Sequence, residues 1–434
     1  MPYSRPSRRD DFEVAIICAL PLEYDAVCYV FDEFWDDDGD HYGRAPGDPN
    51  YYTTGRVGKY NVVLALLPQM GKVNAASAAA SMRSSYCGVR LALLVGICGG
   101  LPFAGHGEIL LGDVVISKTV IQYDFGRLYP DKFSTKSTTE HNLGRPSKDV
   151  RSLVATFETD RGREQLEQLS AHFLEQLRGQ AAQKNRQGKY DYPGTALDRL
   201  FEASYRHKHH ATAECVCRDC HNDSDPVCDK VLSSSCDDLG CSDHHLVVRN
   251  RLQKRRQSTS NDSKTTPHIT LHVGAIASTD MVIKSATDRD KISKLTGAIA
   301  FEMEGAGIWD EVPCIVVKGV CDYADSHKAK GWQNYAAATA TSAAKAILKR
   351  SIQTDKVQKE CVSSWHYTSI EILDNADSNQ DTPTVQPQSS RAFSTIPFPP
   401  DPNFVERVKI SSWITDRVAY PGGRAALVGL GGMG

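Results

Sequence analysis

Residues 312–325 read VPCIVVKGVCDYAD, an apolar run that is interrupted by one lysine and ends in acidic residues. The run does not alternate between apolar and polar positions, so it predicts a strand that is buried on both faces of a sheet. Further strands are predicted at residues 14–18, 60–67, 90–102 and 111–121, with two more between 267 and 283. Helices are predicted after Pro21, at 71–86 and at 334–350. We therefore expect an α/β fold of three layers, in which helices cover both faces of a mostly parallel mixed sheet.

Length and charge narrow the class of protein. The chain has 434 residues, 41% of them hydrophobic, and a formal net charge of -3. A chain of this length exceeds what one ordinary hydrophobic core requires, so we expect one large domain with additional segments. The charge does not favour a dedicated nucleic-acid binder, so small molecules or proteins are the expected partners. The N-terminus is polar up to Phe12, and no run of 18 apolar residues occurs. We therefore expect neither secretion nor membrane insertion, a cytoplasmic location, and thiols that are reduced or bound to metal.

Shifts in composition divide the chain. The α/β domain is predicted at residues 12–352, with a largely helical or irregular insertion at about 145–268 that contains a Cys/His-rich, basic stretch. Residues 353–392 include a segment rich in Asp, Ser, Gln and Pro, which is typical of a linker. A second unit is predicted at 393–434.

Seven short motifs bring a known family into view. In chain order they are AIICALPLEYDAV (15–27), MGKVNAA (70–76), VGICGG (95–100), GDVVIS (112–117), IASTD (276–280), FEMEGAG (301–307) and VKGVCDYAD (317–325). This series resembles the nucleoside phosphorylase and nucleosidase superfamily, which includes purine and uridine phosphorylases. Within this superfamily, the motifs are most similar to those of the domain at the N-terminus of fungal NLR-like proteins.

The C-terminal residues resemble the entry into an NB-ARC-type NTPase domain. The text AALVGLGGMG ends the chain and offers glycines whose backbone N–H groups suit a phosphate loop, namely Gly429, Gly431, Gly432 and Gly434. No lysine follows them, so we expect no ATP hydrolysis by this segment. Taken alone, the glycine cluster is also compatible with a flexible tail.

The resemblance assigns roles to the acidic residues. Glu304 is expected to accept hydrogen bonds from the ribose hydroxyls, and Glu302 to support the end of its strand. Asp322 is expected to protonate the departing purine, which requires burial of its carboxyl, and Glu23 to orient the attacking water. The alternative interpretations are a helix cap for the glutamates 302 and 304, an ordinary turn residue for Asp322, and a solvated first helical turn for Glu23.

Other positions follow from the same resemblance. Met303 is expected to pack under the sugar, and Val282 and Ile283 to sandwich the base. Cys98 and Gly99 are expected at the substrate.

The sequence favours water over phosphate as the nucleophile. A phosphorylase needs fixed donors such as Arg for the phosphate dianion. The loop at residues 18–27 has no Arg and carries Glu23, and Ile97 stands where relatives often have Ser or Thr. Two more departures from the family pattern, Lys318 in place of Arg and Thr279 in place of Gly, indicate altered or reduced activity as an alternative.

Relatives in immune-type proteins act on adenine nucleotides, so the resemblance implies ATP or a similar purine nucleotide as substrate. Candidate phosphate ligands are the basic residues Lys284, Arg289, Lys291, Arg206, His207 and Lys208. The run RNRLQKRR from Arg249 is interpreted as an exposed face or a flexible arm.

The insertion contains a set of cysteine and histidine residues, namely Cys215, Cys217, Cys220, His221, Cys228, Cys236, Cys241, His244 and His245. The pairs Cys217/Cys220 and Cys241/His244 have spacings that tetrahedral zinc accepts. The intervals between the pairs are irregular, so structural zinc and reduced thiols both remain open.

We conclude from the sequence that the chain is a purine N-glycosidase, needs no cofactor for catalysis, and acts as a homo-oligomeric effector domain wired to an NTPase switch. The alternatives are a phosphate-dependent phosphorylase and a catalytically silent ligand sensor or interaction module.

Overall fold

The computed structural model describes residues 5–351, apart from 106, 132, 137–142, 211–214, 223–224 and 261–267. The predicted linker at 353–392 and the NTPase-like unit at 393–434, with its four glycines, lie outside the described residues. The strands are β1 (Val14–Cys18), β2 (Glu33–Phe34), β3 (Tyr52–Val57), β4 (Tyr60–Leu66), β5 (Leu91–Gly100), β6 (Phe103–Ala104), β7 (Gly107–Glu108), β8 (Val114–Gln122), β9 (Gly126–Leu128), β10 (Phe133–Thr135), β11 (Leu271–Ser278), β12 (Ala298–Glu302) and β13 (Cys314–Asp322).

The helices are α1 (Pro21–Cys28), α2 (Lys72–Ser85), α3 (Lys148–Phe157), α4 (Asp160–Gln183), α5 (Cys236–Leu239), α6 (Asn250–Ser260), α7 (Ala286–Thr296), α8 (Gly305–Ile308) and α9 (Gln333–Arg350).

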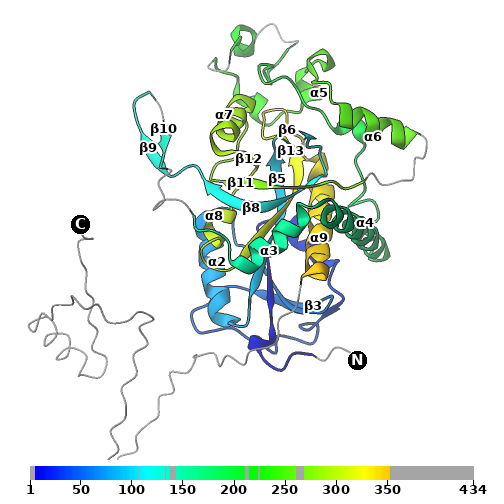
Figure 1. Cartoon of the computed structure of the whole chain (residues 1–434). Helices are drawn as coiled ribbons and strands as arrows, with labels where there is room; N and C mark the ends of the chain where they lie inside the picture. Colours follow the sequence, from blue (N-terminus) through cyan, green and yellow to red (C-terminus); the bar gives the residue numbers. More distant parts are fainter. Residues whose placement is uncertain are drawn as a thin grey trace, which may run out of the picture. The chain divides into compact units, whose positions relative to one another are not determined.

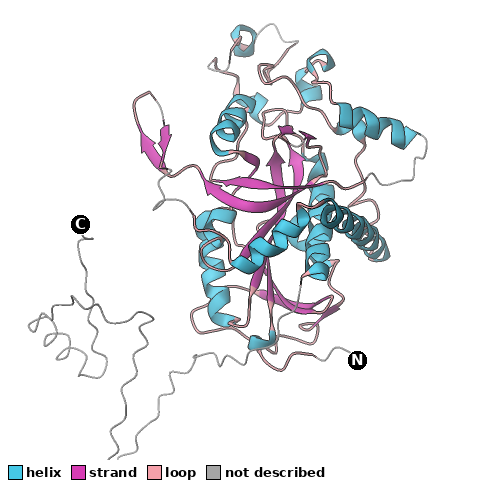
Figure 2. Cartoon of the chain, in the orientation of Figure 1, coloured by secondary structure: helices cyan, strands magenta, loops and turns pink. Residues whose placement is uncertain are grey.

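One large mixed sheet organises the domain, as Figure 2 shows. Its strand order is β12-β11-β8-β13-β5-β1-β4-β3-β2. Strands β13, β5, β1 and β4 pair in parallel, as do β8, β11 and β12, whereas β13 and β8 run antiparallel. The predicted α/β class with a mostly parallel mixed sheet is therefore confirmed.

Helices cover both faces of this sheet (Figure 1). Helix α9 contacts β13, β5 and β8, and it is itself covered by α1 and α4, whereas α2 and α8 pack together on the other side. Every residue of α9 from Tyr335 to Leu348 is buried. A helix that is buried all round needs small side chains where it meets the sheet, and the alanine-rich text of α9 supplies them.

The predicted insertion divides into two parts. Helices α3 and α4 begin at the caps Ser147 and Thr159, and their buried side chains belong to the main core. The Cys/His-rich part lies further along, at one end of the sheet beside α7 (Figure 1).

Two expectations fail. Only β11 forms between 267 and 283, because the backbone N–H of Asp280 and the hydroxyl of Thr279 bond to Asp124 instead of continuing the strand. Met281 and Val282 follow as a loop and are 54% and 53% exposed.

The basic run from Arg249 is also not an exposed arm. Arg249 is buried, and its guanidinium donates to Asp198 Oδ1 at 2.7 Å and to the Tyr323 hydroxyl. The Tyr323 hydroxyl in turn donates to Asp198 at 2.8 Å. Local charge density predicted a solvated surface, but buried acidic partners far away in the sequence decide the outcome.

The next two arginines of the run meet a second buried acid. Arg251 and Arg255 both bind Asp113, which also contacts His272 at 3.0 Å. Burial alone would raise the pKa of Asp113, but the hydrogen bonds and charges of His272 and Arg251 outweigh it and lower this pKa. The run therefore fastens the end of the insertion to the α/β domain.

No helix in the described part of the chain combines the length and the apolar character that crossing a bilayer requires.

A close approach between β13 and α9 gives a test of the fold. A Cβ at Gly319 would lie 1.9 Å from the carbonyl oxygen of Ala336. Gly319→Ala is therefore expected to lower the free energy of unfolding by about 1–3 kcal/mol, measured by urea denaturation. Gly179→Ala in α4 is the control, because nothing lies within 4 Å of the added Cβ. It is expected to stabilise by up to about 1 kcal/mol, and equal stabilities of the two variants would contradict this packing.

Candidate active site

A buried lysine lies at the centre of the acidic motifs. Lys318, on β13, is 1% exposed, and its Nζ lies 3.1 Å from Glu304 Oε2 and 3.6 Å from Glu302 Oε2. Burial alone would lower the pKa of Lys318, but Glu304, Glu302 and Glu23 outweigh burial and raise it. The ammonium group is therefore charged and offsets the carboxylates around it.

Glu23 reaches the same cluster from the start of α1. Its Oε2 accepts the N–H groups of Ala19 and Leu20, each at 2.9 Å, and its Oε1 accepts the N–H of Ile97 at 2.8 Å. Glu23 is 2% exposed. The interpretation as a solvated helix residue is therefore wrong for this position.

The surroundings of Glu23 shift its pKa and fix its carboxylate. Burial raises the pKa of Glu23, with Lys318 opposing and Glu304 adding to the rise. A Cβ at Gly96 would lie 2.3 Å from Glu23 Oε1, so only glycine at position 96 admits the carboxylate. Three of about four acceptor positions on the carboxylate are used by backbone N–H groups, which leaves one for a water proton.

Glu302 and Glu304 differ in what they bind. The Glu302 carboxylate accepts the N–H groups of Glu304 and Gly305 at 2.9–3.0 Å, so it holds the turn into α8. Burial raises the pKa of Glu302. Among the described residues, Glu304 Oε1 accepts one long bond, from the N–H of Gly71 at 3.4 Å, and Oε2 accepts a bond from Lys318. Glu304 therefore keeps acceptor positions for a ligand.

Asp322 closes β13. Its Oδ1 accepts the N–H of Ala324 at 2.8 Å, and Ala324 has a φ of 50°. A Cβ at Gly99 would lie 3.0 Å from this oxygen. The side chain is 15% exposed and Lys328 Nζ lies 3.7 Å from Oδ2, so Asp322 is less buried than its expected role implied.

Strand β5 connects the two ends of the site. Gly96 and Gly99 pair with Lys318 and Asp322 across β5 and β13 and are about 10 Å apart along the strand. Cys98, between them, is buried, and its pKa is raised by burial first and then by Asp322, Glu302 and Glu23. The acidic residues from distant motifs thus surround one stretch of β5.

The residues that were predicted to contact the base and the sugar differ in burial and in their distance from the site. Met303 is part-buried in the turn between Glu302 and Glu304. Ile283 is part-buried, and its carbonyl accepts a bond from Lys328 at 3.2 Å, which brings it near Asp322. Val282 is exposed and joins none of these contacts.

Sequence reasoning missed a polar network beside Glu304. Lys72 Nζ binds the Asp124 carboxylate, and the N–H of Lys72 donates to Asp280 Oδ1 at 2.9 Å. The Thr279 hydroxyl also donates to Asp124. Burial alone would raise the pKa of Asp124, but the hydrogen bonds from Lys72, the Asp280 N–H and Gln122 together with the Lys72 charge outweigh burial and lower this pKa. Lys72 and Asp280 both stand in quoted motifs, but Asp124 does not, so no sequence signal marked it.

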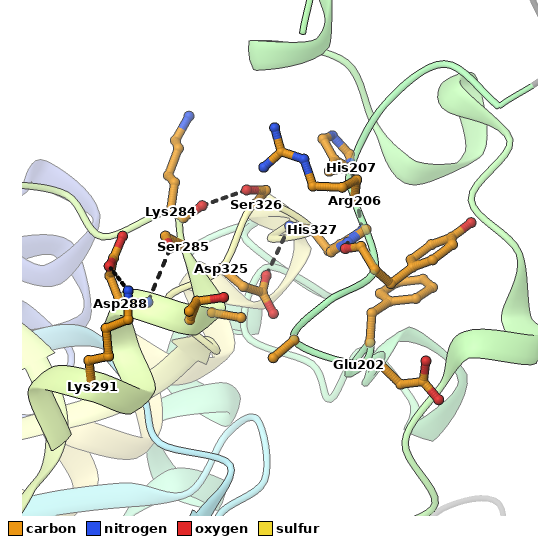
Figure 3. A pocket seen from close by; sticks show the side chains of 15 residues that line it. Glu202, Arg206, His207, Lys284, Ser285, Asp288, Lys291, Asp325, Ser326 and His327 are labelled. Atoms are coloured by element: carbon orange, nitrogen blue, oxygen red, sulfur yellow. Dashed lines mark hydrogen bonds and ion pairs between the residues drawn. The ribbon is translucent and has the colours of Figure 1, made fainter. Parts of the chain in front are cut away.

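A cavity of about 370 Å³ lies between the insertion and the start of α7 (Figure 3). It includes Asp325, three residues after Asp322, but neither Asp322 nor the buried glutamates and lysine described above. Four of the predicted phosphate ligands line it, namely Lys284, Lys291, Arg206 and His207.

The other two phosphate candidates point elsewhere. Arg289 is buried and donates to the Tyr323 carbonyl at 2.9 Å, and Lys208 Nζ donates to the Cys220 carbonyl. Of the predicted zinc pairs, only Cys217 and Cys241 join a cluster of potential ligands. Cys220 instead contacts Arg206 at 3.4 Å.

Comparison with known proteins agrees with the motifs. The family model described as "Phosphorylase superfamily" matches residues 13–187. An NLR-like protein of Hyaloscypha variabilis is 31% identical over 353 residues, which are 79% of this chain and 30% of that protein. A 5'-methylthioadenosine/S-adenosylhomocysteine nucleosidase of Mycobacterium bovis is 30% identical over 119 residues, which are 27% of this chain and 41% of that protein.

Solved structures with low identity were also found. The 5'-methylthioadenosine/S-adenosylhomocysteine nucleosidase and the futalosine hydrolase of Helicobacter pylori are each 15% identical, with TM-scores of 0.43 and 0.44. Each match covers 78% of this chain and 98% of the solved one. The chain spans less than half the length of the curated relatives described above. Residues 13–187 of this chain are therefore similar to the phosphorylase superfamily.

Proposed function

We propose that this domain hydrolyses the ribosyl C–N bond of a purine nucleoside or nucleotide. The observation that carries the proposal is the Glu304 carboxylate, which is buried, fixed by Lys318, and still able to accept bonds from a ligand. Breaking this bond creates positive charge on the sugar. A fixed carboxylate that accepts bonds from the ribose hydroxyls binds more strongly as that charge develops.

Glu23 and Asp322 take the two proton-handling roles. The remaining acceptor position of Glu23 orients a water and takes its proton as the new C–O bond forms. Asp322 delivers a proton to the departing purine, and its Oδ1 is held in place by the Ala324 N–H. Met303 lies under the sugar and Ile283 beside the base.

Water is favoured over phosphate by the surroundings of the nucleophile. The Ile97 N–H, a donor that phosphate would need, is taken by Glu23. Burial raises the pKa of this glutamate, and the backbone hydrogen bonds from Ile97 and Leu20 oppose part of the rise. A phosphate dianion would meet a negative charge there, so phosphorolysis is the second candidate.

The cavity between the insertion and α7 supports a phosphorylated substrate. Lys284 and Lys291 line one wall and Arg206 the opposite wall (Figure 3), and cations in this arrangement suit phosphate groups. Together with the resemblance to adenine-nucleotide nucleosidases, this favours ATP or a related purine nucleotide. The role as a homo-oligomeric effector in an NLR-like protein is part of the same proposal, as is a cytoplasmic location.

Base release tests the reaction. The purified chain is incubated with ATP, AMP, adenosine and inosine, with and without inorganic phosphate, and free base is measured by chromatography. We expect base and free sugar at equal rates with or without phosphate. Release that requires phosphate and yields a sugar phosphate would establish the phosphorylase instead, and binding without release would establish the ligand sensor.

Asp322→Asn separates catalysis from folding. The asparagine oxygen can still accept the Ala324 N–H, but the side chain cannot donate the carboxyl proton. We expect base release to fall by about 10²–10⁴-fold with an unchanged melting temperature. Asp290→Asn, on α7, is the control with full activity expected, and an equally active Asp322→Asn would remove this residue from the mechanism.

Lys318→Met tests the buried charge cluster. Removing one partner of a buried ion pair typically costs about 3–5 kcal/mol. The loss measured by denaturation is expected to be smaller at pH 5 than at pH 7.5, because the stranded carboxylates are neutral when protonated.

The matched control for this variant is Lys118→Met. Lys118 also pairs with a carboxylate, that of Glu158 at 2.8 Å, but both side chains are exposed. A change of at most about 1 kcal/mol is expected there. Equal losses in the two variants would mean that Lys318 does not neutralise the cluster.

A further inference from the structure

Two groups of four side chains in and around the insertion converge on a point. The first consists of His207, Cys236, Cys241 and His327, and the second of His209, Cys215, Cys217 and Cys228. Within each group the four nitrogen and sulfur atoms all lie within 4.8 Å of one another. His327 is the one member outside the insertion, five residues after Asp322.

The distances in the first group match a tetrahedral metal. The Nδ1 atoms of His207 and His327 are 3.3 Å apart. Cys236 Sγ lies 3.4 Å from His327 Nδ1 and 3.8 Å from His207 Nδ1, and Cys241 Sγ lies 3.7 Å from His207 Nδ1. Zinc bonds of about 2.3 Å to sulfur and about 2.0–2.1 Å to nitrogen place tetrahedral ligand atoms about 3.3–3.8 Å apart.

Hydrogen bonding does not account for this convergence. His207 Nδ1 approaches three ligand atoms at once, and a ring nitrogen carries at most one proton. The other ring nitrogens are used elsewhere: His207 Nε2 contacts the Ser234 carbonyl at 3.1 Å and His327 Nε2 the Tyr205 carbonyl at 3.0 Å. Donation to a carbonyl places the proton on Nε2 and leaves the Nδ1 lone pair directed at the cluster, as in metal-bound histidine.

The second group has the same geometry. His209 Nδ1 lies 3.7 Å from Cys215 Sγ, 3.7 Å from Cys217 Sγ and 3.5 Å from Cys228 Sγ. The backbone N–H of Cys228 donates to Cys217 Sγ at 3.4 Å. An N–H donor of this kind stabilises a thiolate.

The described residues of this part of the insertion form only a small hydrophobic core. Its own hydrophobic cluster contains three buried residues, Cys217, Val231 and Leu239. So small a core is far below what a segment of this length requires, and metal ligation is a common substitute.

We propose that each group binds one Zn²⁺ ion, and that the ion held by His207, Cys236, Cys241 and His327 clamps the insertion to the loop after Asp322. Binding deprotonates the thiols, whose protons go to solvent. Closed sets of two cysteines with two histidines, and of three cysteines with one histidine, are the ligand sets of structural zinc.

The clamp has a consequence for the neighbouring cavity. His207 and His327 both line it, and Phe201, another lining residue, stacks on His327 at 4.2 Å between ring centroids. The metal therefore sets the distance between the wall that carries Arg206 and the wall that carries Lys284.

Metal content and hydrogen exchange test this proposal. The purified chain is expected to hold about two zinc ions by elemental analysis, and Cys236→Ser and Cys228→Ser to lose one each. Cys220→Ser is the control, a buried insertion cysteine in neither group, and should keep both. Cobalt exchanged for zinc should give the visible absorption of tetrahedral thiolate sites. Exchange at residues 323–328 should rise in Cys236→Ser and not in Cys228→Ser.

Three results would overturn the inference. The first is a chain without stoichiometric zinc, purified without chelator and dialysed against Zn²⁺. The second is an equal loss of zinc from Cys220→Ser and Cys236→Ser. The third is unchanged exchange at residues 323–328 in a Cys236→Ser variant that has lost its ion, which would refute the clamp. None of these readouts depends on the nucleosidase activity.

Discussion

The ion pair between Lys318 and Glu304 is the constraint on which the site depends. Three carboxylates, of Glu23, Glu302 and Glu304, are withdrawn from water around a single ammonium group. Taking such charges out of water is expensive, and only mutual attraction and backbone donors offset the cost. The cluster therefore forms only where β13, β12, β5 and α1 meet with their backbones correctly spaced. An arginine in this position would give two parallel bonds, whereas lysine gives a point charge shared among neighbours.

The excess of negative charge in the cluster lowers the free energy of unfolding by an amount that depends on pH. Burial raises the pKa values of Glu23 and Glu302 in the folded chain. As the pH rises from the ordinary glutamate pKa to the raised one, the unfolded chain has already lost these protons while the folded chain retains them. Stability therefore falls across this window, and above it the cost is complete. Buried carboxyl groups whose pKa values are shifted in this way are typical of functional sites, which supports a chemical role over a structural one.

Much of the fold could be predicted from short stretches of sequence, whereas parts of the site could not. Continuous apolar runs marked β1, β4, β5, β8 and β13, and Pro21 marked the start of α1, because those signals lie within a few residues. The loop at Thr279 and the anchoring of Arg249 depend on acids far away in the sequence, Asp124 and Asp198. The sequence named the five cysteines of the two ligand clusters as candidates, but not their histidines as ligands and not their grouping. Their members are irregularly spaced, and His327 belongs to a different part of the chain.

The triad of Asp198, Arg249 and Tyr323 has a consequence for how this domain can vary. Asp198 and Arg249, 51 residues apart, meet at one tyrosine that directly follows Asp322. The segment between Asp198 and Arg249 therefore begins and ends at the same point of the α/β domain. Doubling the length of such an excursion costs only about 0.6 kcal/mol in closure entropy. Related proteins could therefore replace or lengthen this segment without moving the acidic residues on the sheet. Such a change would alter the residues that line the cavity, and with them the ligand that the cavity accepts.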